Sequence, residues 1–350
     1  MGIEIKATGR AIPARRVTND DLAKRIDTSD EWVRSHTGIG ARHIAGEDIA
    51  CSDLALQAAK NALAQAAGFE NPVDSGNEER ERAIAEAALG LDLIVLATAT
   101  ADYYGCPPTA CIVQDKLGAK NAGAMDVSAC CTGFIYGLET AAGLLSINKE
   151  RKRALVIGAE VLSRITDWED RNCVLFGDGA GAVLIEKTST PAEGPERRGL
   201  LRTILRADGS GTESLIFRRG GSRYPFRTGE TVEKATHIEM NGQAVYNFAV
   251  RAVTETISGL LEMEGITLGD LARIIPHQAN ARIVQAAGKR LGIPEETFFL
   301  NIEEYANTSA ASIPIALDEM NRSGQLKRGD LILTVGFGGG LTYGGNLIIW

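Results

Sequence analysis

The chain has 350 residues, of which 44% are apolar, and it carries a formal net charge of −8. This acidic balance argues against general nucleic-acid binding, which requires a basic face, and no run approaches the 18 apolar residues of a membrane span. The six cysteines form no CxxC pair with a histidine partner, so we expect neither a metal nor a redox cofactor. The N-terminus has no signal-peptide pattern, and Lys6 stands where myristoylation needs Ser or Thr. We therefore expect a protein of the reducing cytoplasm.

Apolar strand-like segments alternate with helical patterns along most of the chain. In the first half these segments are 91–100, 123–129, 153–162 and 179–187, and in the second half 272–278, 297–302, 331–337 and 341–349. The alternation predicts an α/β protein with mainly parallel buried sheets and helices on both faces. The connection at about 187–236 is rich in Gly, Arg and Thr, which is typical of a surface flap outside the core.

The segment DVSACCTGF at 126–134 places a cysteine where a helix begins. After Cys131 the apolar positions recur at helical spacing, so its thiol lies in the first turn. There the helix dipole favours the thiolate, which makes a nucleophile without a strong base. The alternative is that Cys130 and Cys131 are two small buried residues, and for Cys130 we prefer that interpretation.

Three further segments end strands or precede helices. His277 lies in PHQAN, between a strand and an amphipathic helix, where open α/β sheets place ligand chemistry; alone it could be a core histidine. Asn307 precedes a Thr-Ser pair that can cap the next helix, although Asn307 could itself be the capping or turn residue. The glycines at 338–340 can bring backbone N–H groups close to a reacting carbonyl, or merely relieve crowding.

Together with 28–39 and 170–184, these segments make the whole chain, residues 1 to 350, resemble the β-ketoacyl-acyl-carrier-protein synthase III family. These are the thiolase-like condensing enzymes that initiate type II fatty acid synthesis. The resemblance implies a duplicated five-layered αβαβα thiolase-like fold with the active site between two halves. Residues 1–190 would hold the nucleophilic cysteine, and residues 191–350 the histidine and asparagine.

The resemblance also implies roles for individual residues. Cys131 resembles the acylated nucleophile, and His277 and Asn307 the pair that stabilises an enolate. The backbone of Cys131 and Gly340 resembles the oxyanion hole. Trp32, Arg171 and Asn280 resemble the coenzyme A site, and Leu175 and Phe176 the acyl pocket. Cys106 occupies the position that closes the end of the partner subunit's acyl pocket. In members restricted to acetyl primers this position holds an aromatic residue. Cysteine is smaller, so we expect this protein to accept longer primers unless Tyr104 or Leu175 fills the space left at the end of the pocket.

The chain departs from the family pattern in three places. His36 stands where the family often has an arginine for the coenzyme A phosphates, and the segments 70–90 and 190–236 are longer than usual. A carrier protein is strongly acidic, so its docking on a chain of net charge −8 needs a local basic patch. Arg282 and Lys289, with Arg290 beside them, share a helix face that offers one, unless they are simply solvated.

The implied reaction takes an acyl-coenzyme A and malonyl-acyl-carrier protein as substrates, in a homodimer, with no nucleic acid or membrane as partner. The alternatives on the same fold are an acyltransferase that hands the acyl group to an alcohol or amine, and a condensing enzyme of secondary metabolism. A papain-like thiol hydrolase also orders Cys before His before Asn. A non-catalytic homologue that binds the carrier protein is a third class.

Overall fold

Two β-sheets form the framework of the protein. The computed structural model describes residues 2–350 apart from 71–76, 192, 195, 219 and 230–236. The first sheet has the strand order β1 (Ile3–Ala11), β7 (Asp178–Lys187), β6 (Arg153–Val161), β4 (Leu93–Ala97) and β5 (Gly123–Val127). The second has the order β11 (Arg273–Pro276), β12 (Leu331–Gly338), β13 (Thr342–Ile349) and β8 (Gly199–Ala207).

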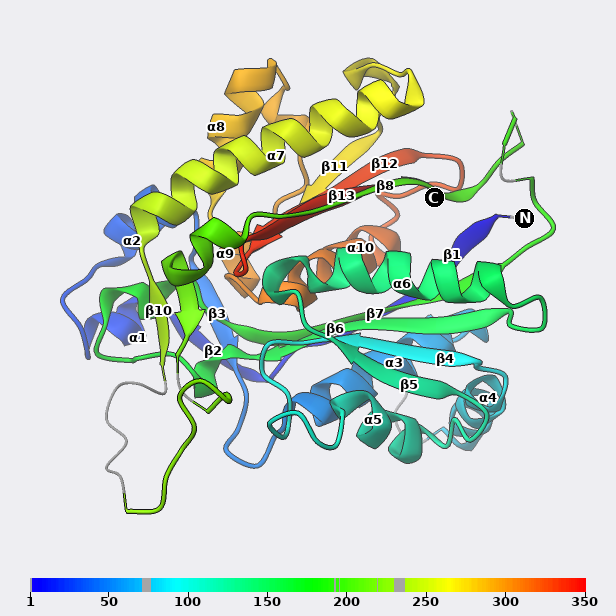
Figure 1. Cartoon of the computed structure of the whole chain (residues 1–350), viewed down its shortest axis with the longest axis horizontal. Coiled ribbons are helices and arrows are strands. Elements are labelled where there is room, and N and C mark those ends of the chain that lie inside the picture. Colours follow the sequence, from blue (N-terminus) through cyan, green and yellow to red (C-terminus); the bar gives the residue numbers. More distant parts are fainter. Residues whose placement is uncertain (1, 71–76, 192, 195, 219, 230–236) are drawn as a thin grey trace.

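Helices complete five layers around these sheets (Figure 1). The outer face of the first sheet is covered by α3 (Cys51–Ala66), α4 (Glu78–Leu89) and α5 (Thr109–Leu117). Between the sheets lie α6 (Gly133–Ile147) and α10 (Ser312–Arg322), and α7 (Gly242–Glu264) and α8 (Ala281–Leu291) cover the second sheet. The predicted αβαβα layering is therefore confirmed, while the boundary at residue 190 stays a prediction.

Both sheets are mixed, so the prediction of mainly parallel sheets is wrong. Only the pairs β4–β5, β4–β6 and β11–β12 are parallel among the paired strands that the structure describes. The strands β6 and β7 are antiparallel and are joined through the short 3₁₀ turns η2 (Leu162–Arg164) and η3 (Arg171–Leu175). A tight turn likewise joins β12 to β13. Antiparallel neighbours need no crossover helix between them, whereas parallel neighbours do. The pattern of apolar segments in the sequence did not distinguish parallel from antiparallel pairs.

Two further segments differ from the sequence prediction. Residues 297–302 form no strand: Phe298 makes an isolated bridge to Ile274, between the 3₁₀ turn η6 (Glu295–Thr297) and α9 (Ile302–Tyr305). Conversely, β8 lies inside the segment predicted as a surface flap and pairs with β13 in the second sheet. Most of its side chains are only partly buried, as expected for an edge strand, so Arg202, Thr203 and Arg206 can stand among its apolar residues.

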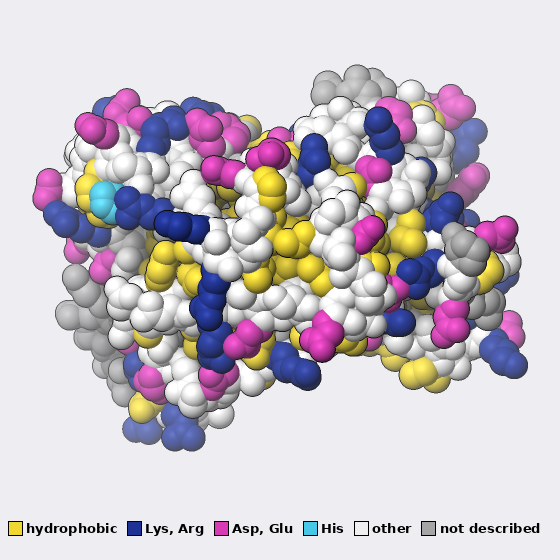
Figure 2. All heavy atoms as spheres, turned by 90° about the horizontal axis from the view of Figure 1, so that it is seen from above, with side chains coloured by type: hydrophobic (Ala, Val, Ile, Leu, Met, Phe, Trp, Pro, Cys, Tyr) yellow, Lys and Arg dark blue, Asp and Glu magenta, His cyan; other side chains and the backbone are white. Residues whose placement is uncertain are grey.

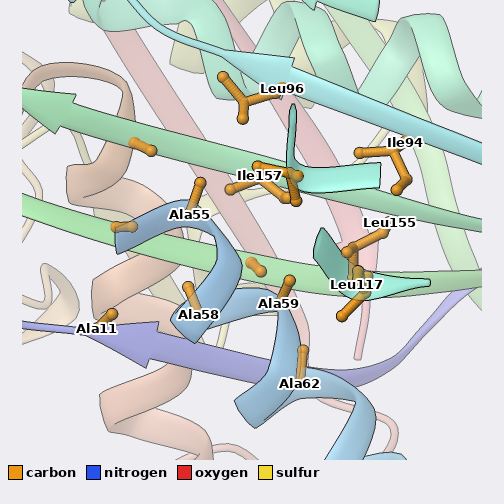
Figure 3. Packing of buried hydrophobic residues seen from close by; sticks show 14 of the residues in the cluster. Ala11, Ala55, Ala58, Ala59, Ala62, Ile94, Leu96, Leu117, Leu155 and Ile157 are labelled. Carbon is orange, nitrogen blue, oxygen red and sulfur yellow. The ribbon is translucent and has the colours of Figure 1, made fainter. Parts of the chain in front are cut away.

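Small side chains allow α3 to lie directly on the first sheet. Ala55, Ala58, Ala59 and Ala62 face the strands and are fully buried (Figure 3). The approach is so close that a Cβ on Gly9 of β1 would lie 2.3 Å from the amide nitrogen of Ala62. Larger side chains from the strands and α5 fill the rest of this layer, which makes the sheet a rigid base for the site above it.

The helix α6 and the preceding turn η1 (Cys130–Thr132) form an unusually apolar segment. Among the described residues, Cys130–Ile147 is one helical stretch that is long enough and, by its mean hydropathy, apolar enough to cross a membrane, although Glu139 and Thr140 interrupt its apolar residues. Half of it is buried, and Phe134, Ile135 and Leu138 pack between the two sheets. A helix covered on both sides by sheets is apolar around most of its surface, so we interpret α6 as a core helix.

The smaller elements gather at one end of the sheets, on the left in Figure 1. There β2 (Arg15–Thr18) pairs with β3 (Ala41–Ile44), and β9 (Leu215–Phe217) pairs with β10 (Ile238–Met240). The other elements there are α1 (Asn19–Ala23), α2 (Asp30–Thr37), η4 (Gly209–Ser214) and η7 (Ser309–Ala311), whereas η5 (Leu268–Asp270) follows α7 at the opposite end. Several of these elements form the walls of the cavity described next.

Candidate active site

Cys131, His277 and Asn307 line one cavity of about 330 Å³, although they come from three distant parts of the sequence. Cys131 arrives from the first half on η1, His277 directly follows β11, and Asn307 precedes η7. The cavity has the size of a small-molecule site and is mostly apolar. The structure thus brings the three predicted residues together.

Cys131 lies in the 3₁₀ turn that leads into α6, two residues before the α-helix begins. Burial raises the pKa of its thiol to about 12; the neighbouring Cys130 adds to this rise, and a hydrogen bond with the Ser309 side chain opposes it. At neutral pH the thiol is therefore protonated. Burial therefore opposes the effect expected of the helix terminus, and a proton acceptor near the thiol would assist the nucleophile.

His277 is held rigidly at the end of β11. Its amide donates to the carbonyl oxygen of Val335 at 2.7 Å, and its ring Nδ1 lies 2.7 Å from Ser312 Oγ. The ring meets the Phe337 ring edge-on, with 5.5 Å between the centroids. Burial lowers the pKa of His277 to about 3, so the imidazole is neutral at physiological pH.

Asn307 has both a local role and a place in the cavity wall. Its Oδ1 accepts the backbone N–H of Ser309 at 2.8 Å, so of the two local roles considered above the turn role is present, while the N-cap of η7 is Thr308. Its backbone pairs with Leu175 and Gly177 beside the cavity. The predicted Thr-Ser cap of the following helix is wrong, because the N-cap of α10 is Ala311, without a side-chain bond. With its oxygen engaged, Asn307 has its Nδ2 donor left for a ligand.

The structure places Gly338, and not Gly340, against the nucleophile. A Cβ on Gly338 would lie 2.8 Å from the Cys131 Cβ and 2.9 Å from its amide nitrogen, so only glycine fits there. Gly340 is exposed, its carbonyl accepts from Thr212 Oγ1 at 3.2 Å, and it is not among the described residues that line the cavity. Gly339 approaches the sulfur of Cys130. The oxyanion-hole role of Gly340 stays a prediction, and within the glycine run Gly338 is the residue that packs against Cys131.

The predicted coenzyme A residues lie at the mouth of the same cavity. Trp32 is 39% exposed, and the imidazole of His36 stacks on it at a centroid distance of 4.5 Å. Arg171 is held by Asp27 at 2.7 Å. The Asn280 side chain accepts from the backbone N–H of Arg282 and donates to the carbonyl oxygen of His36 at 3.2 Å, which ties α8 to α2.

The apolar wall contains Leu175 and Phe176, as predicted, together with residues that sequence reasoning missed. Those residues come from β9, which lies in the segment interpreted as a flap, and from β10 just after it: Leu215, Ile216, Phe217, Ile238 and Met240. Cys106 is exposed and is not among the described residues lining this cavity. Its neighbours Tyr104 and Gly105 line a second, adjacent cavity.

Arg282, Lys289 and Arg290 are exposed on α8, whose first turn lines the cavity through Asn280 and Ile283. Figure 2 views the molecule from the side of α7 and α8, and the Lys and Arg side chains there stand among Asp and Glu side chains. The three basic residues therefore form a small patch, and the surface around them carries both positive and negative charges.

Five layers with a cysteine, a histidine and an asparagine in an apolar cavity between the halves define a thiolase-like condensing enzyme. The family model "3-Oxoacyl-[acyl-carrier-protein (ACP)] synthase III" matches residues 125–209, and the model of its C-terminal part matches 261–350. The chain belongs to the β-ketoacyl-acyl-carrier-protein synthase III family, and it is thus an acyltransferase of fatty acid synthesis.

Individual relatives agree over nearly the full length. The chain is 47% identical to the β-ketoacyl-[acyl-carrier-protein] synthase III of Natranaerobius thermophilus, covering 99% of each protein. It matches the crystal structure of 3-oxoacyl-[acyl-carrier-protein] synthase III from Aquifex aeolicus with a TM-score of 0.84 and 41% identity, over 100% of both chains. It also resembles the priming β-ketosynthase of the R1128 polyketide pathway, with a TM-score of 0.85 and 31% identity, over 99% of this chain and 96% of that one.

Proposed function

We propose that this protein condenses an acyl-coenzyme A primer with malonyl-acyl-carrier protein through an acyl group on Cys131. The observation that carries the proposal is the meeting of Cys131, His277 and Asn307 in one apolar cavity, with Trp32 and Arg171 at its mouth. A covalent acyl-enzyme divides a difficult reaction between two thioesters into two easier steps.

In the first half-reaction the Cys131 sulfur attacks the thioester carbonyl of the primer, and coenzyme A leaves. The oxyanion of the tetrahedral intermediate accepts from the Cys131 amide and from the backbone of the Gly338–Gly339 segment, which packs against Cys131 and Cys130. Each such donor contributes about 3 kcal/mol in comparable sites.

In the second half-reaction malonyl-carrier protein loses carbon dioxide and forms an enolate, whose carbon attacks the acyl-cysteine and releases the thiolate of Cys131. The neutral imidazole of His277 suits this step. Ser312 Oγ accepts from the Gln278 amide at 3.4 Å and can donate its own proton to His277 Nδ1. We therefore assign the ring proton to Nε2. That N–H and Asn307 Nδ2 are the two donors to the enolate oxygen.

The coenzyme A site is proposed at the cavity mouth. The exposed indole of Trp32 offers a stacking surface for adenine, and Arg171 supplies a cation nearby. His36 covers part of that indole by stacking on it. We propose that the His36 side chain contacts the coenzyme A phosphates in place of the arginine that the family often has at this position.

The proposed partners are a malonyl-acyl-carrier protein docked on the basic patch Arg282, Lys289 and Arg290, and a second copy of this chain. The patch lies on α8, whose other face reaches the cavity mouth through Asn280 and Ile283. A carrier protein docked on α8 would place the arm that carries the malonyl thioester at the cavity mouth, from which it reaches Cys131. All six cysteines lie in the described part of the chain and are free thiols, which supports a cytoplasmic location.

A condensing role in secondary metabolism is the second candidate, favoured by the similarity to the priming ketosynthase. The two candidates use the same chemistry and differ in the primer and the carrier protein. Primer selection therefore separates them, and the apolar wall built by β9 and β10 is where selection would act.

Product analysis tests the proposal. The protein is incubated with acetyl-coenzyme A and malonyl-carrier protein, and the carrier protein is analysed by mass spectrometry. We expect 3-oxobutyryl-carrier protein and carbon dioxide, and neither with Cys131→Ala. Release of free acetate without a condensed product would instead indicate a hydrolase, and acyl transfer to an added amine or alcohol would indicate the acyltransferase alternative.

A further inference from the structure

Glu160 is a fully buried carboxyl group next to the nucleophile, and the reaction as described above does not use it. It lies near the end of β6. A buried carboxyl needs hydrogen-bond donors, and these come from the loop after β4. The Ala99 amide lies 3.1 Å from both carboxyl oxygens, and the hydroxyls of Thr100 and Thr98 donate to Oε2 at 2.6 and 3.3 Å.

Ser309 connects this carboxyl to the nucleophile. Its side chain makes a hydrogen bond with the thiol of Cys131 and another with Glu160. The single hydroxyl proton of Ser309 can be donated to the sulfur, which lowers the pKa of the thiol, or to the Glu160 carboxylate. When it is donated to Glu160, the Ser309 oxygen can accept the proton of the thiol, so the order thiol, hydroxyl, carboxylate is chemically consistent. Ser309 also lines the cavity together with Cys131.

The backbone holds Ser309 in an unfavourable conformation for this contact. Its φ is +47°, which is rare for a residue with a side chain. Two contacts fix it there: its amide donates to Asn307 Oδ1 at 2.8 Å, and β6 packs so closely that a Cβ on Gly158 would lie 2.1 Å from the Ala310 carbonyl oxygen. Strained residues held in this way are concentrated at functional sites.

We infer that Ser309 and Glu160 form the path that accepts the proton of Cys131 during acylation. As sulfur attacks the thioester carbon, the S–H bond breaks and its proton passes to Ser309 Oγ, while Ser309 gives its own proton to the Glu160 carboxylate. When the C–S bond to coenzyme A breaks, the proton returns along the same path to the leaving thiolate. Glu160 is then again a carboxylate. Ser309 touches the reacting sulfur, and Glu160 acts through it. The inference rests on the proposed role of Cys131.

The electrostatics favour Glu160 over His277 as the acceptor. Burial raises the pKa of Glu160 to about 7, whereas burial lowers the pKa of His277 to about 3. The Glu160 carboxylate is therefore the more basic of the two groups. The other titratable groups around this network are Cys130, on η1, and Cys51, whose sulfur lies 3.4 Å from Thr98 Oγ1. Asp102 and Asp126 lie beyond Cys51.

The test is the pH profile of single-turnover acylation by acetyl-coenzyme A, followed by the intact mass of the protein. For the wild type we expect the rate to rise with an apparent pKa near 7, because only the carboxylate accepts a proton, and then to level off. Glu160→Gln keeps the shape and an acceptor oxygen. It should acylate about 100-fold more slowly at pH 7.5, and its rate should keep rising with pH without a plateau. Ser309→Ala should behave in the same way.

Asp178→Asn is the matched control. Asp178 is a buried carboxyl on the neighbouring strand β7, it accepts from the Ala45 amide and the Ser163 hydroxyl, and burial raises its pKa as well. This variant should lose stability but keep the wild-type pH profile. Glu160→Asp retains a carboxyl group. Its acylation rate should therefore again rise near pH 7 and level off, at a lower value than in the wild type.

Two results would overturn the inference. One is wild-type acylation rate and profile in Ser309→Ala, which decides the matter even if Glu160→Gln does not fold. The other is a pH profile of acylation in Asp178→Asn that loses the rise near pH 7 and the plateau to the same extent as in Glu160→Gln. A wild-type protein that is never acylated at Cys131 would instead overturn the proposed function itself.

Discussion

Gly158→Ala should damage the site without touching any residue in it. Position 158 lies on β6, facing η7, where a Cβ would come 2.1 Å from the Ala310 carbonyl oxygen and 2.7 Å from its carbon. Ordinary contacts of a Cβ begin near 3.4 Å, and the obstacle is backbone that cannot rotate away. The turn η7 must therefore retreat by about 1 Å, and it carries Ser309 and, through a hydrogen bond, Asn307 with it.

The magnitude follows from this displacement. Overpacking of this kind costs roughly 1–3 kcal/mol of the free energy of unfolding, which guanidinium denaturation measures. A misplacement of about 1 Å at reacting groups costs on the order of 100-fold in rate, which condensation at saturating substrates measures. We expect both losses together, with the protein still folded.

Gly143→Ala is the control for the same change of side chain. Gly143 lies on the exposed side of α6, where nothing stands within 4 Å of an added Cβ. Alanine is favoured over glycine inside a helix by about 1 kcal/mol, so this variant should be slightly more stable and fully active. Wild-type condensation by Gly158→Ala would show that the position of η7 does not set the site, and would refute the reasoning.

Three further groups of variants test the enolate donors, the docking of the carrier protein and the acyl pocket. His277→Ala and Asn307→Ala should keep acyl transfer from coenzyme A but lose most malonyl decarboxylation, because their donors act on the enolate; near-normal condensation by either would contradict that role. Arg282→Glu and Lys289→Glu should raise KM for malonyl-carrier protein alone, and added salt should shrink the difference; equal effects on both substrates would indicate a folding defect. Cys106→Phe should move primer preference towards acetyl, with about fourfold per carbon at stake if each methylene contributes about 0.8 kcal/mol. An unchanged profile across primers of two to twelve carbons would end that idea.

The sequence was most informative where chemistry coincides with the end of an element. Cys131 and His277 each follow an apolar strand and precede a helical pattern, so their placement at one edge of the layers could be predicted. The choice among the glycines at 338–340 could not, because it depends on the pairing of Gly338 with Thr342 in the β12–β13 turn. No local pattern specifies that register.

Burial is the second property that the sequence left open. The helix terminus suggested a thiolate, but the segments that enclose Cys131 come from both halves of the chain, and together they exclude the water that would stabilise the charge. Glu160 carried a usable signal: a carboxylate within the apolar run 153–162 is costly unless it is paired, so it merited a functional hypothesis. The parts of the cavity wall formed by β9 and β10 could not be predicted, because each strand is three residues long and shows no pattern in the sequence.

The most direct measurement of the central claim is the fate of the acyl group on the protein. After incubation with acyl-coenzyme A and digestion, the peptide containing Cys130 and Cys131 should carry one acyl mass, located on Cys131 by fragmentation. Adding malonyl-carrier protein should then remove it with release of carbon dioxide and formation of the 3-oxoacyl-carrier protein. An acyl group on Cys130, an adduct that persists in Cys131→Ala, or an acyl-enzyme that malonyl-carrier protein cannot discharge would contradict the account.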